Sequence, residues 1–122
     1  MNKPKIVVLC GSSKFVDIMA VAEWFIERDE LAITMGLNLL PGWYSKEPIP
    51  DHLAEHEGCA AEMDELHLRK IDLADEIFVV DWEGYIGKST ANEISYAKCT
   101  GKRIRYFSDD FIGKKVCDVI IG

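Results

Sequence analysis

The sequence predicts a single α/β domain, residues 1–122, with a mainly parallel sheet of about five strands. Short apolar runs rich in β-branched residues end at or near a glycine, and helical apolar spacing follows each of them. The clearest case is the segment 77–101, IFVVDWEGYIGKSTANEISYAKCTG, with a buried strand, an acidic turn containing two glycines, and a helix that begins near Ser89. Ligands of such sheets bind beyond the carboxyl ends of the strands, so we expect a site around residues 81–89.

Composition limits the possible partners. A chain of 122 residues with 48% hydrophobic and 29% charged residues can bury a core without disulfides or metal. Its net charge of −7 disfavours a nucleic-acid polymer as partner, although one small phosphorylated ligand could be held by backbone amides. No apolar segment is long enough for a membrane span, and the start lacks a signal-peptide pattern. The four cysteines form no CxxC pair, so we expect reduced thiols in a cytoplasmic protein.

The first expected strand, Ile6–Cys10, leads through a polar turn into a helix with apolar residues spaced from Phe15 to Ile26. Amides, hydroxyls and a helix amino terminus in this turn could bind an anion. The alternative is an ordinary connection in which a serine caps the helix. The residues of the turn are Gly11, Ser12, Ser13 and Lys14.

A second strand is expected within residues 31–40, followed by a loop, 41–50, that carries Trp43 and Tyr44. These aromatic side chains could stack on a nucleobase or pack on the domain surface or a neighbouring subunit. A helical region then extends over 51–73, and Gly58 is expected to kink or divide it.

This helical region contains the sequence HLAEH, residues 52–56, which matches the H-x-x-E-H zinc signature. His52 and His56 would share a helix face and could bind zinc, with Glu55 as base. Two solvated histidines are the alternative, and the preferred interpretation has no metal. Further along, His67 falls on the same stripe as His56, so it points inward or toward the sheet edge. It could be a satisfied core group or a catalytic residue.

The expected strand 77–80 leads to Asp81, and the next helix is expected to carry Glu93 in its first turn. Thr90 and Glu93 fit a capping box, which is a purely structural role for the glutamate. A further strand is expected at 103–107. Val116–Ile121 could be an edge strand or a tail packed on a partner. Together these elements predict a doubly wound, Rossmann-like or flavodoxin-like domain.

Three pieces of the chain resemble the nucleoside 2-deoxyribosyltransferase-like superfamily: CGSSK, HLRKIDLADEIFVVD and GYIGKSTANEISYAKCTGKRI. The similarity covers most of residues 5–107 and is greatest to a short branch with a G-Y-I-G-x-S-T-x-x-E turn. The resemblance implies that Glu93 attacks the anomeric carbon of a deoxyribose and expels the base. A second base or water would then resolve the glycosyl-enzyme ester, as in retaining glycosidases. It also implies that Asp81 orients sugar hydroxyls, while Gly87 and Ser89 line the same turn.

The chain departs from the superfamily pattern at two places. The usual S-x-G order is G-x-S here, at Gly87 and Ser89. Where other members have an aspartate, this chain has His67, which could act as general acid or mark a site with changed or lost activity. Asp72 is a second candidate for the acid. The CGSSK turn is similar to that of deoxynucleoside 5′-monophosphate N-glycosidases, where it holds the phosphate; Lys14 could add positive charge.

The sequence thus predicts an enzyme that cleaves the N-glycosidic bond of a 2′-deoxynucleoside or its 5′-monophosphate, by hydrolysis or base transfer and without a cofactor. The resemblance also implies a homodimer or larger homo-oligomer, and the aromatic 41–50 loop and the carboxyl-terminal tail are the candidates for that contact. One alternative is a non-catalytic nucleotide-binding or sensing module on the same fold. Another is a zinc hydrolase that uses His52 and His56.

Overall fold

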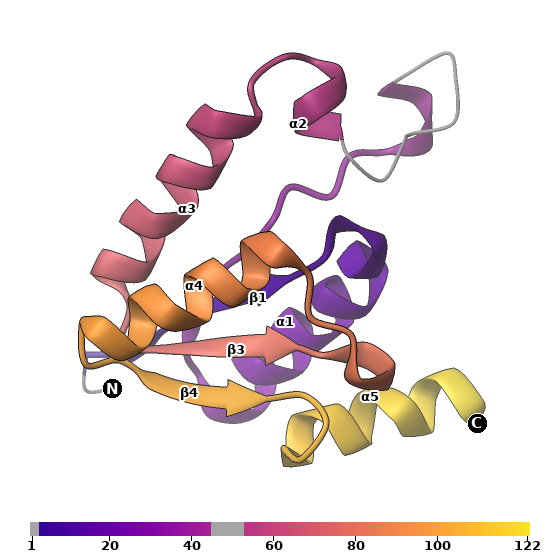
Figure 1. Cartoon of the computed structure of the whole chain (residues 1–122). Coiled ribbons are helices and arrows are strands. Elements are labelled where there is room, and N and C mark those ends of the chain that lie inside the picture. The colour runs from indigo at the N-terminus through magenta and orange to yellow at the C-terminus, as the bar shows by residue number, and fades with distance from the viewer. Residues whose placement is uncertain (1–2, 45–52) are drawn as a thin grey trace.

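The computed structural model describes residues 3–44 and 53–122. Within them, a parallel sheet contains four strands in the order β2-β1-β3-β4 (Figure 1). The strands are β1 (Ile6–Gly11), β2 (Ile33–Met35), β3 (Glu76–Val80) and β4 (Arg103–Tyr106). The prediction of an α/β chain with a parallel sheet is confirmed, whereas the expected number of about five strands is wrong.

The difference lies at the carboxyl terminus, where α5 (Phe111–Ile121) takes the place of the possible edge strand or tail at Val116–Ile121. The side chain of Asp110 caps this helix by accepting a hydrogen bond from the backbone N–H of Ile112. Ile112 and Val116, four residues apart, are buried, while the last three residues of the helix are exposed. This burial follows the helical period and not the alternation of a strand.

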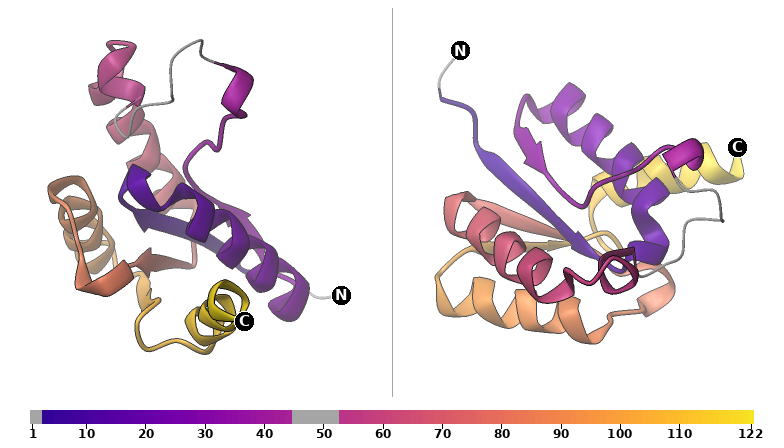
Figure 2. Two further views of the ribbon diagram at one scale, coloured as in Figure 1. Left: turned by 90° about the vertical axis from the view of Figure 1, so that its right-hand side faces the viewer. Right: turned by 90° about the horizontal axis from the view of Figure 1, so that it is seen from above.

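Helices cover both faces of the sheet. The helices α1 (Val16–Glu30) and α5 pack on one face, and α3 (Ala60–Leu73) and α4 (Lys88–Cys99) on the other (Figure 2). Alternate residues of β1 and β3 enter the two cores, and β3 is buried along its whole length. A strand buried on both faces explains why its sequence is continuously apolar. The arrangement is consistent with a Rossmann-like fold.

The strand order places a topological switch point between β1 and β3. The chain leaves β1 through α1 to β2 on one side, then crosses the sheet through α3 to β3 on the other. The helices that follow β1 and β3 therefore lie on opposite faces, and the crevice between the two connections is where ligands of such sheets bind.

The helical region after the second strand is divided, as predicted, at Gly58. The short helix α2 (Leu53–His56) ends two residues before Gly58, and α3 begins two residues after it, at Ala60. Gly58 has a φ angle of +76°, a conformation that residues with a Cβ rarely adopt. The helix α2 and the first turns of α3 extend beyond the sheet (Figure 1). No helix in the described part of the chain is long and apolar enough to span a membrane.

A buried arginine connects three elements of the fold. The guanidinium of Arg105, in β4, lies 2.7 Å from Glu30, 2.8 Å from Glu76 and 2.9 Å from Asp110. Burial would lower the pKa of Arg105, but hydrogen bonds from its guanidinium to the three carboxylates outweigh this effect and raise it. The arginine thus links α1, β3 and the start of α5.

Candidate functional site

A cavity of about 570 Å³ lies at the carboxyl ends of β1 and β3. Its walls come from the turn after β1, the inner face of α3, and the loop that leads into α4. Residues 37–44 and α2 contribute to the outer side. Its volume falls within the range of about 300–1,000 Å³ that is common for small-molecule sites.

Most of the residues predicted for the site line this cavity. They come from four stretches that are far apart in the sequence, and the two largest, 11–13 and 87–93, meet because β1 and β3 are adjacent strands. These residues are Gly11, Ser12, Ser13, Tyr44, His67, Gly87, Ser89 and Glu93.

Ser12 has a local structural role in addition to its place on the cavity wall. Its hydroxyl accepts a hydrogen bond of 3.2 Å from the backbone N–H of Lys14 and caps the short 3-10 turn Ser13–Phe15. Lys14 is not among the lining residues, and its ammonium lies 5.1 Å from the ring centre of Tyr85. The serine cap considered from the sequence is therefore present. The charge of Lys14 is directed at an aromatic ring.

Two further predicted residues lie away from the cavity. Trp43 is 83% exposed and is not a lining residue. Both carboxylate oxygens of Asp81 accept hydrogen bonds from Ser108, one from its backbone N–H at 2.9 Å and one from its hydroxyl at 2.6 Å. Asp81 thus fastens the connection after β4 and does not line the cavity.

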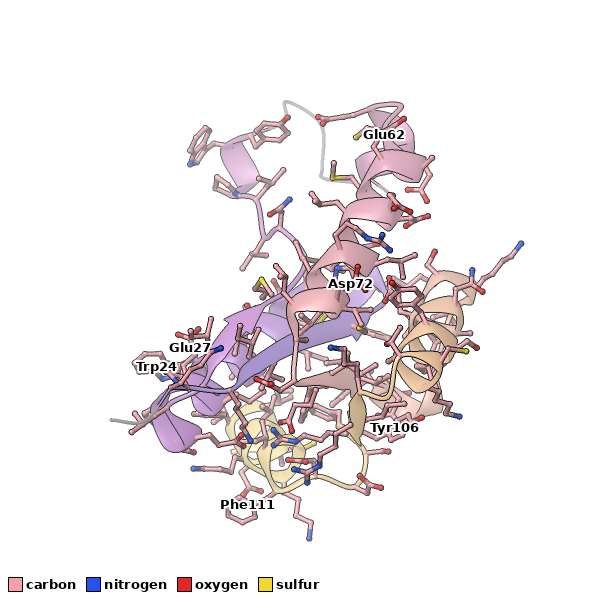
Figure 3. All side chains as sticks on the ribbon, turned by 90° about the vertical axis from the view of Figure 1, so that its left-hand side faces the viewer. Trp24, Glu27, Glu62, Asp72, Tyr106 and Phe111 are labelled. Carbon is pink, nitrogen blue, oxygen red and sulfur yellow. The ribbon has the colours of Figure 1, made fainter. Side chains whose placement is uncertain are left out.

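Asp72, the second candidate for the acid, lies near the carboxyl end of α3 (Figure 3). It accepts a hydrogen bond from the hydroxyl of Tyr96 and pairs with Arg69 at 3.2 Å. It is not one of the residues that line the cavity. These contacts join α3 to α4.

The histidines of the H-x-x-E-H sequence lie outside what the structure describes: residue His52 falls in the gap, and nothing is described of the side chain of His56. The outer part of the 41–50 loop, residues 45–50, also lies outside the described residues. The predictions placed on these residues stay predictions.

Glu93 owes its position to the way in which α4 begins. Gly87 is the N-cap in an extended conformation, and as a glycine it has no side chain with which to cap the helix. The predicted capping box is therefore wrong, because Thr90 lies inside the helix, three residues beyond the N-cap. Thr90 and Glu93 are both buried, one helical turn apart, and both line the cavity. Glu93 is thus available for a role other than capping.

Glu93 is one of three buried side chains that meet at the inner end of the cavity. The Nε2 atom of His67 lies 3.8 Å from Oε1 of Glu93 and 3.5 Å from Sγ of Cys10. The side chains come from α3, α4 and the end of β1. The exposed fractions of Cys10, His67 and Glu93 are 0%, 3% and 8%. The contact between Cys10 and His67 could not be read from the sequence, since the residues are 57 positions apart.

Burial disfavours charge on Glu93 and on Cys10. It raises the pKa of Glu93 to about 7, although a hydrogen bond with Cys10 opposes the shift and the charge of Asp64 adds slightly to it. Burial also raises the pKa of the Cys10 thiol well above its usual value, and the nearby carboxylate of Glu93 adds to this effect. At neutral pH the thiol is protonated, and Glu93 is divided between its acid and carboxylate forms.

Burial has the opposite effect on the pKa of His67, the basic residue among the three. It lowers the pKa of His67 to about 4, the positive charge of Lys70 lowers it further, and a backbone hydrogen bond with Leu9 acts against both. The separation of 3.8 Å between His67 and Glu93 is within the range of an ion pair. Both pKa shifts nevertheless favour the uncharged forms, so the two groups are neutral together at mildly acidic pH.

Comparison of the chain with protein-family models, with curated proteins and with solved structures finds no match in any of the three. The family resemblance seen in the sequence therefore stays a prediction.

Proposed function

We propose that this protein cleaves the N-glycosidic bond of a 2′-deoxynucleoside or 2′-deoxynucleoside 5′-monophosphate, with Glu93 as the nucleophile. The observation that carries the proposal is the position of Glu93. Its carboxyl group is buried at the inner end of a cavity of about 570 Å³, at the switch point of the sheet. A carboxylate at the reacting carbon is the group that an oxocarbenium-like transition state requires.

In the proposed reaction, a carboxylate oxygen of Glu93 forms a bond to C1′ of the sugar while the bond from C1′ to the base nitrogen breaks. The electron pair of that bond leaves with the base, which takes up a proton. Water or a second base then attacks C1′ and gives up a proton to solvent, while the bond from C1′ to the Glu93 oxygen breaks and its electron pair returns to the carboxylate. Because burial removes water from the carboxylate, the attacking oxygen is poorly solvated in its ionised form.

His67 has a positioning role in this scheme. With a pKa lowered to about 4, the ring is neutral near pH 7 and holds no spare proton for the leaving base. Its Nε2 atom lies between Cys10 and Glu93, so the ring limits where the carboxylate can lie. The proton for the leaving base would come from solvent that enters the cavity.

The rest of the cavity suits the two ends of a nucleotide. The turn Gly11–Ser13 and the amino-terminal residues 88–90 of α4 offer backbone N–H groups and hydroxyls, which suit a phosphate or sugar hydroxyls. Leu37, Leu40 and Met63 line the cavity and provide apolar surface for a base. Tyr44 also lines it, and its hydroxyl donates a hydrogen bond of 2.8 Å to Glu57.

Release of free base from a panel of deoxynucleosides and their 5′-monophosphates tests the proposal. The unmodified protein and Glu93→Gln would be compared, with and without a second base as acceptor. The matched control is Glu83→Gln, at an exposed glutamate in the 3-10 turn after β3. We expect Glu93→Gln to lose more than about 1,000-fold in rate and the control to keep the full rate.

Equal rates for Glu93→Gln and the unmodified protein would remove Glu93 as nucleophile. Product formed only in the acceptor samples would identify base transfer, and product in both would identify hydrolysis. An absence of base release across the panel, in protein shown to be folded, would overturn the proposed activity.

One observation favours a non-catalytic nucleotide-binding module as second candidate. Burial holds part of Glu93 in its protonated form at neutral pH, and a protonated carboxyl group binds hydroxyls but does not attack carbon. Nucleotide binding measured by calorimetry without any base release, and retained in Glu93→Gln, is the result that this candidate requires.

A further inference from the structure

Cys10, His67 and Glu93 bring three different kinds of metal-binding atom to one place. The sulfur, the ring nitrogen and a carboxylate oxygen all lie within 4.8 Å of one another. None of the three residues is more than 8% exposed, so the group is not an accidental cluster of surface acids. We propose that Cys10, His67 and Glu93 form a binding site for Zn²⁺, with the fourth position of the ion open to the cavity.

Two of the three distances between the ligand atoms are close to those around a tetrahedral ion. Zinc lies about 2.3 Å from cysteine sulfur and about 2.0–2.1 Å from histidine nitrogen or carboxylate oxygen, so two ligands at a tetrahedral angle are about 3.3–3.6 Å apart. The sulfur of Cys10 and Nε2 of His67 are 3.5 Å apart, as this geometry requires. The separation of 3.8 Å between Nε2 and the Glu93 oxygen needs to close by only a few tenths of an ångström.

The ligand set favours zinc over the other common divalent cations. Magnesium and calcium bind almost entirely to oxygen, whereas a mixed set of sulfur, nitrogen and oxygen suits Zn²⁺. Three protein ligands are the number found where the fourth position is kept for water or a ligand. His67 and Glu93 line the cavity, so that position is accessible from it.

The surroundings of the three side chains give a second argument. His67 has a backbone hydrogen bond with Leu9, and histidines that bind metal commonly donate their second ring N–H to such a carbonyl. Among the residues that the structure describes, no lysine or arginine pairs with the buried carboxyl group of Glu93, whose one ion-pair contact is with His67. A bound zinc ion would supply a positive charge, and it would displace to solvent the thiol proton of Cys10 and any proton on Glu93.

This inference does not rest on the proposed function. A carboxylate that holds zinc cannot attack a sugar, so the two uses of Glu93 exclude one another. Where the glycosidic activity exists, added zinc would suppress it and a chelator would restore it.

The test is a titration of the full chain, freed of metal by a chelator and dialysed, with zinc chloride and separately with cobalt chloride. We expect one ion per chain by calorimetry, a cobalt–thiolate charge-transfer band, and a higher midpoint of thermal unfolding. Cys10→Ser, His67→Gln and Glu93→Gln should each weaken zinc binding by more than about tenfold. Cys99→Ser, at an exposed cysteine, is the matched control. Cys59→Ser tests the cysteine that lines the cavity, and both variants should leave the zinc affinity unchanged.

Several results would overturn the site. One is the absence of stoichiometric zinc binding. Another is a folded Cys10→Ser variant with unchanged zinc binding and an unchanged cobalt band. A third is loss of zinc binding only in His52→Ala and His56→Ala. Circular dichroism of each variant shows whether it is folded. Zinc binding without base release would leave the metal site standing while the proposed activity fails, and base release without zinc binding would do the reverse.

Discussion

Glu93→Gln and His67→Gln should change the pH dependence of stability in opposite directions. Folding raises the pKa of Glu93 from 4.5 to about 7. The unfolded chain loses this proton at lower pH than the folded protein does. The free energy of unfolding should therefore fall as the pH rises from about 4.5 to 7. At 1.36 kcal/mol per pKa unit, the full effect is roughly 3 kcal/mol, and relaxation of the interior reduces it to about 1–3 kcal/mol.

The contribution of His67 has the other sign. Folding lowers its pKa from 6.5 to about 4, so the unfolded chain binds this proton first as the pH falls. The free energy of unfolding should fall as the pH drops from about 6.5 to 4, by a similar amount. Between about pH 4.5 and 6.5 the two effects largely cancel in the unmodified protein. Glu93→Gln removes the contribution of Glu93 and leaves that of His67, and His67→Gln does the reverse. The remaining pKa shift persists in each variant because burial is its largest cause.

Urea unfolding at a series of pH values, with a chelator present to keep metal away, measures these slopes. Relative to the unmodified protein, Glu93→Gln should gain stability as the pH rises through this window, and His67→Gln should lose it. A difference of 2 kcal/mol corresponds to a shift of roughly 8 °C in the midpoint of thermal unfolding for a chain of this length. Glu65→Gln, at an exposed residue, is the control. Parallel stability curves for all four proteins would refute the reasoning.

Three further predictions concern activity and packing. Base release should rise with pH and level off above about pH 7, because Glu93 attacks only as a carboxylate; a pH profile of kcat/KM that is flat from pH 5 to 8 would contradict this. Arg105→Met should lower the free energy of unfolding in urea by up to about 3–5 kcal/mol, since the buried Glu76 and the half-buried Glu30 and Asp110 lose their shared guanidinium and, among the described residues, only Lys5 and Arg103 still pair with Glu30 or Glu76. Arg103→Met, at a side chain that is 71% exposed, should lower it by less than about 1 kcal/mol. Gly113→Ala should lower the free energy of unfolding by about 1–3 kcal/mol or more, because the added Cβ would lie 1.9 Å from the carbonyl oxygen of Phe107. An unfolding midpoint equal to that of the unmodified protein would contradict this close contact.

The sequence predicted those parts of the fold in which local signals agree with the tertiary packing. The apolar runs at Ile6 and Ile77 are central strands, and Gly58 divides the helical region. The carboxyl-terminal run VCDVII has the β-branched composition of a strand, but the Asp110 cap makes it a helix. The helix cap at Asp110 and the close packing of Gly113 against the backbone of Phe107 outweigh the preference of these residues for strands.

In the candidate site, too, some features could be predicted from the sequence and others could not. Sequence patterns placed Glu93 and the turn after β1 at one edge of the sheet, and these residues do line one cavity. The position of Asp81 at the end of β3 was correctly predicted, but position alone does not determine that its side chain binds Ser108. Thr90 and Glu93 have the spacing of a capping box, yet Gly87 starts the helix earlier. The part played by Cys10 depends on a contact across 57 residues, for which local spacing carries no signal.

The adjacency of β1 and β3 also has a consequence for how the chain folds. The backbone N–H of Ile6 donates to the side chain of Asp75, 69 residues away, beside the first pairs between the two strands. Closing a loop of this length costs entropy before the contacts that offset it form, which slows folding. During synthesis, β1 gains β3 as its neighbour only after α1, β2, α2 and α3 have been made. Because Cys10, His67 and Glu93 come from both sides of that closure, the site should appear in the same cooperative step as the sheet, with no active partly folded form.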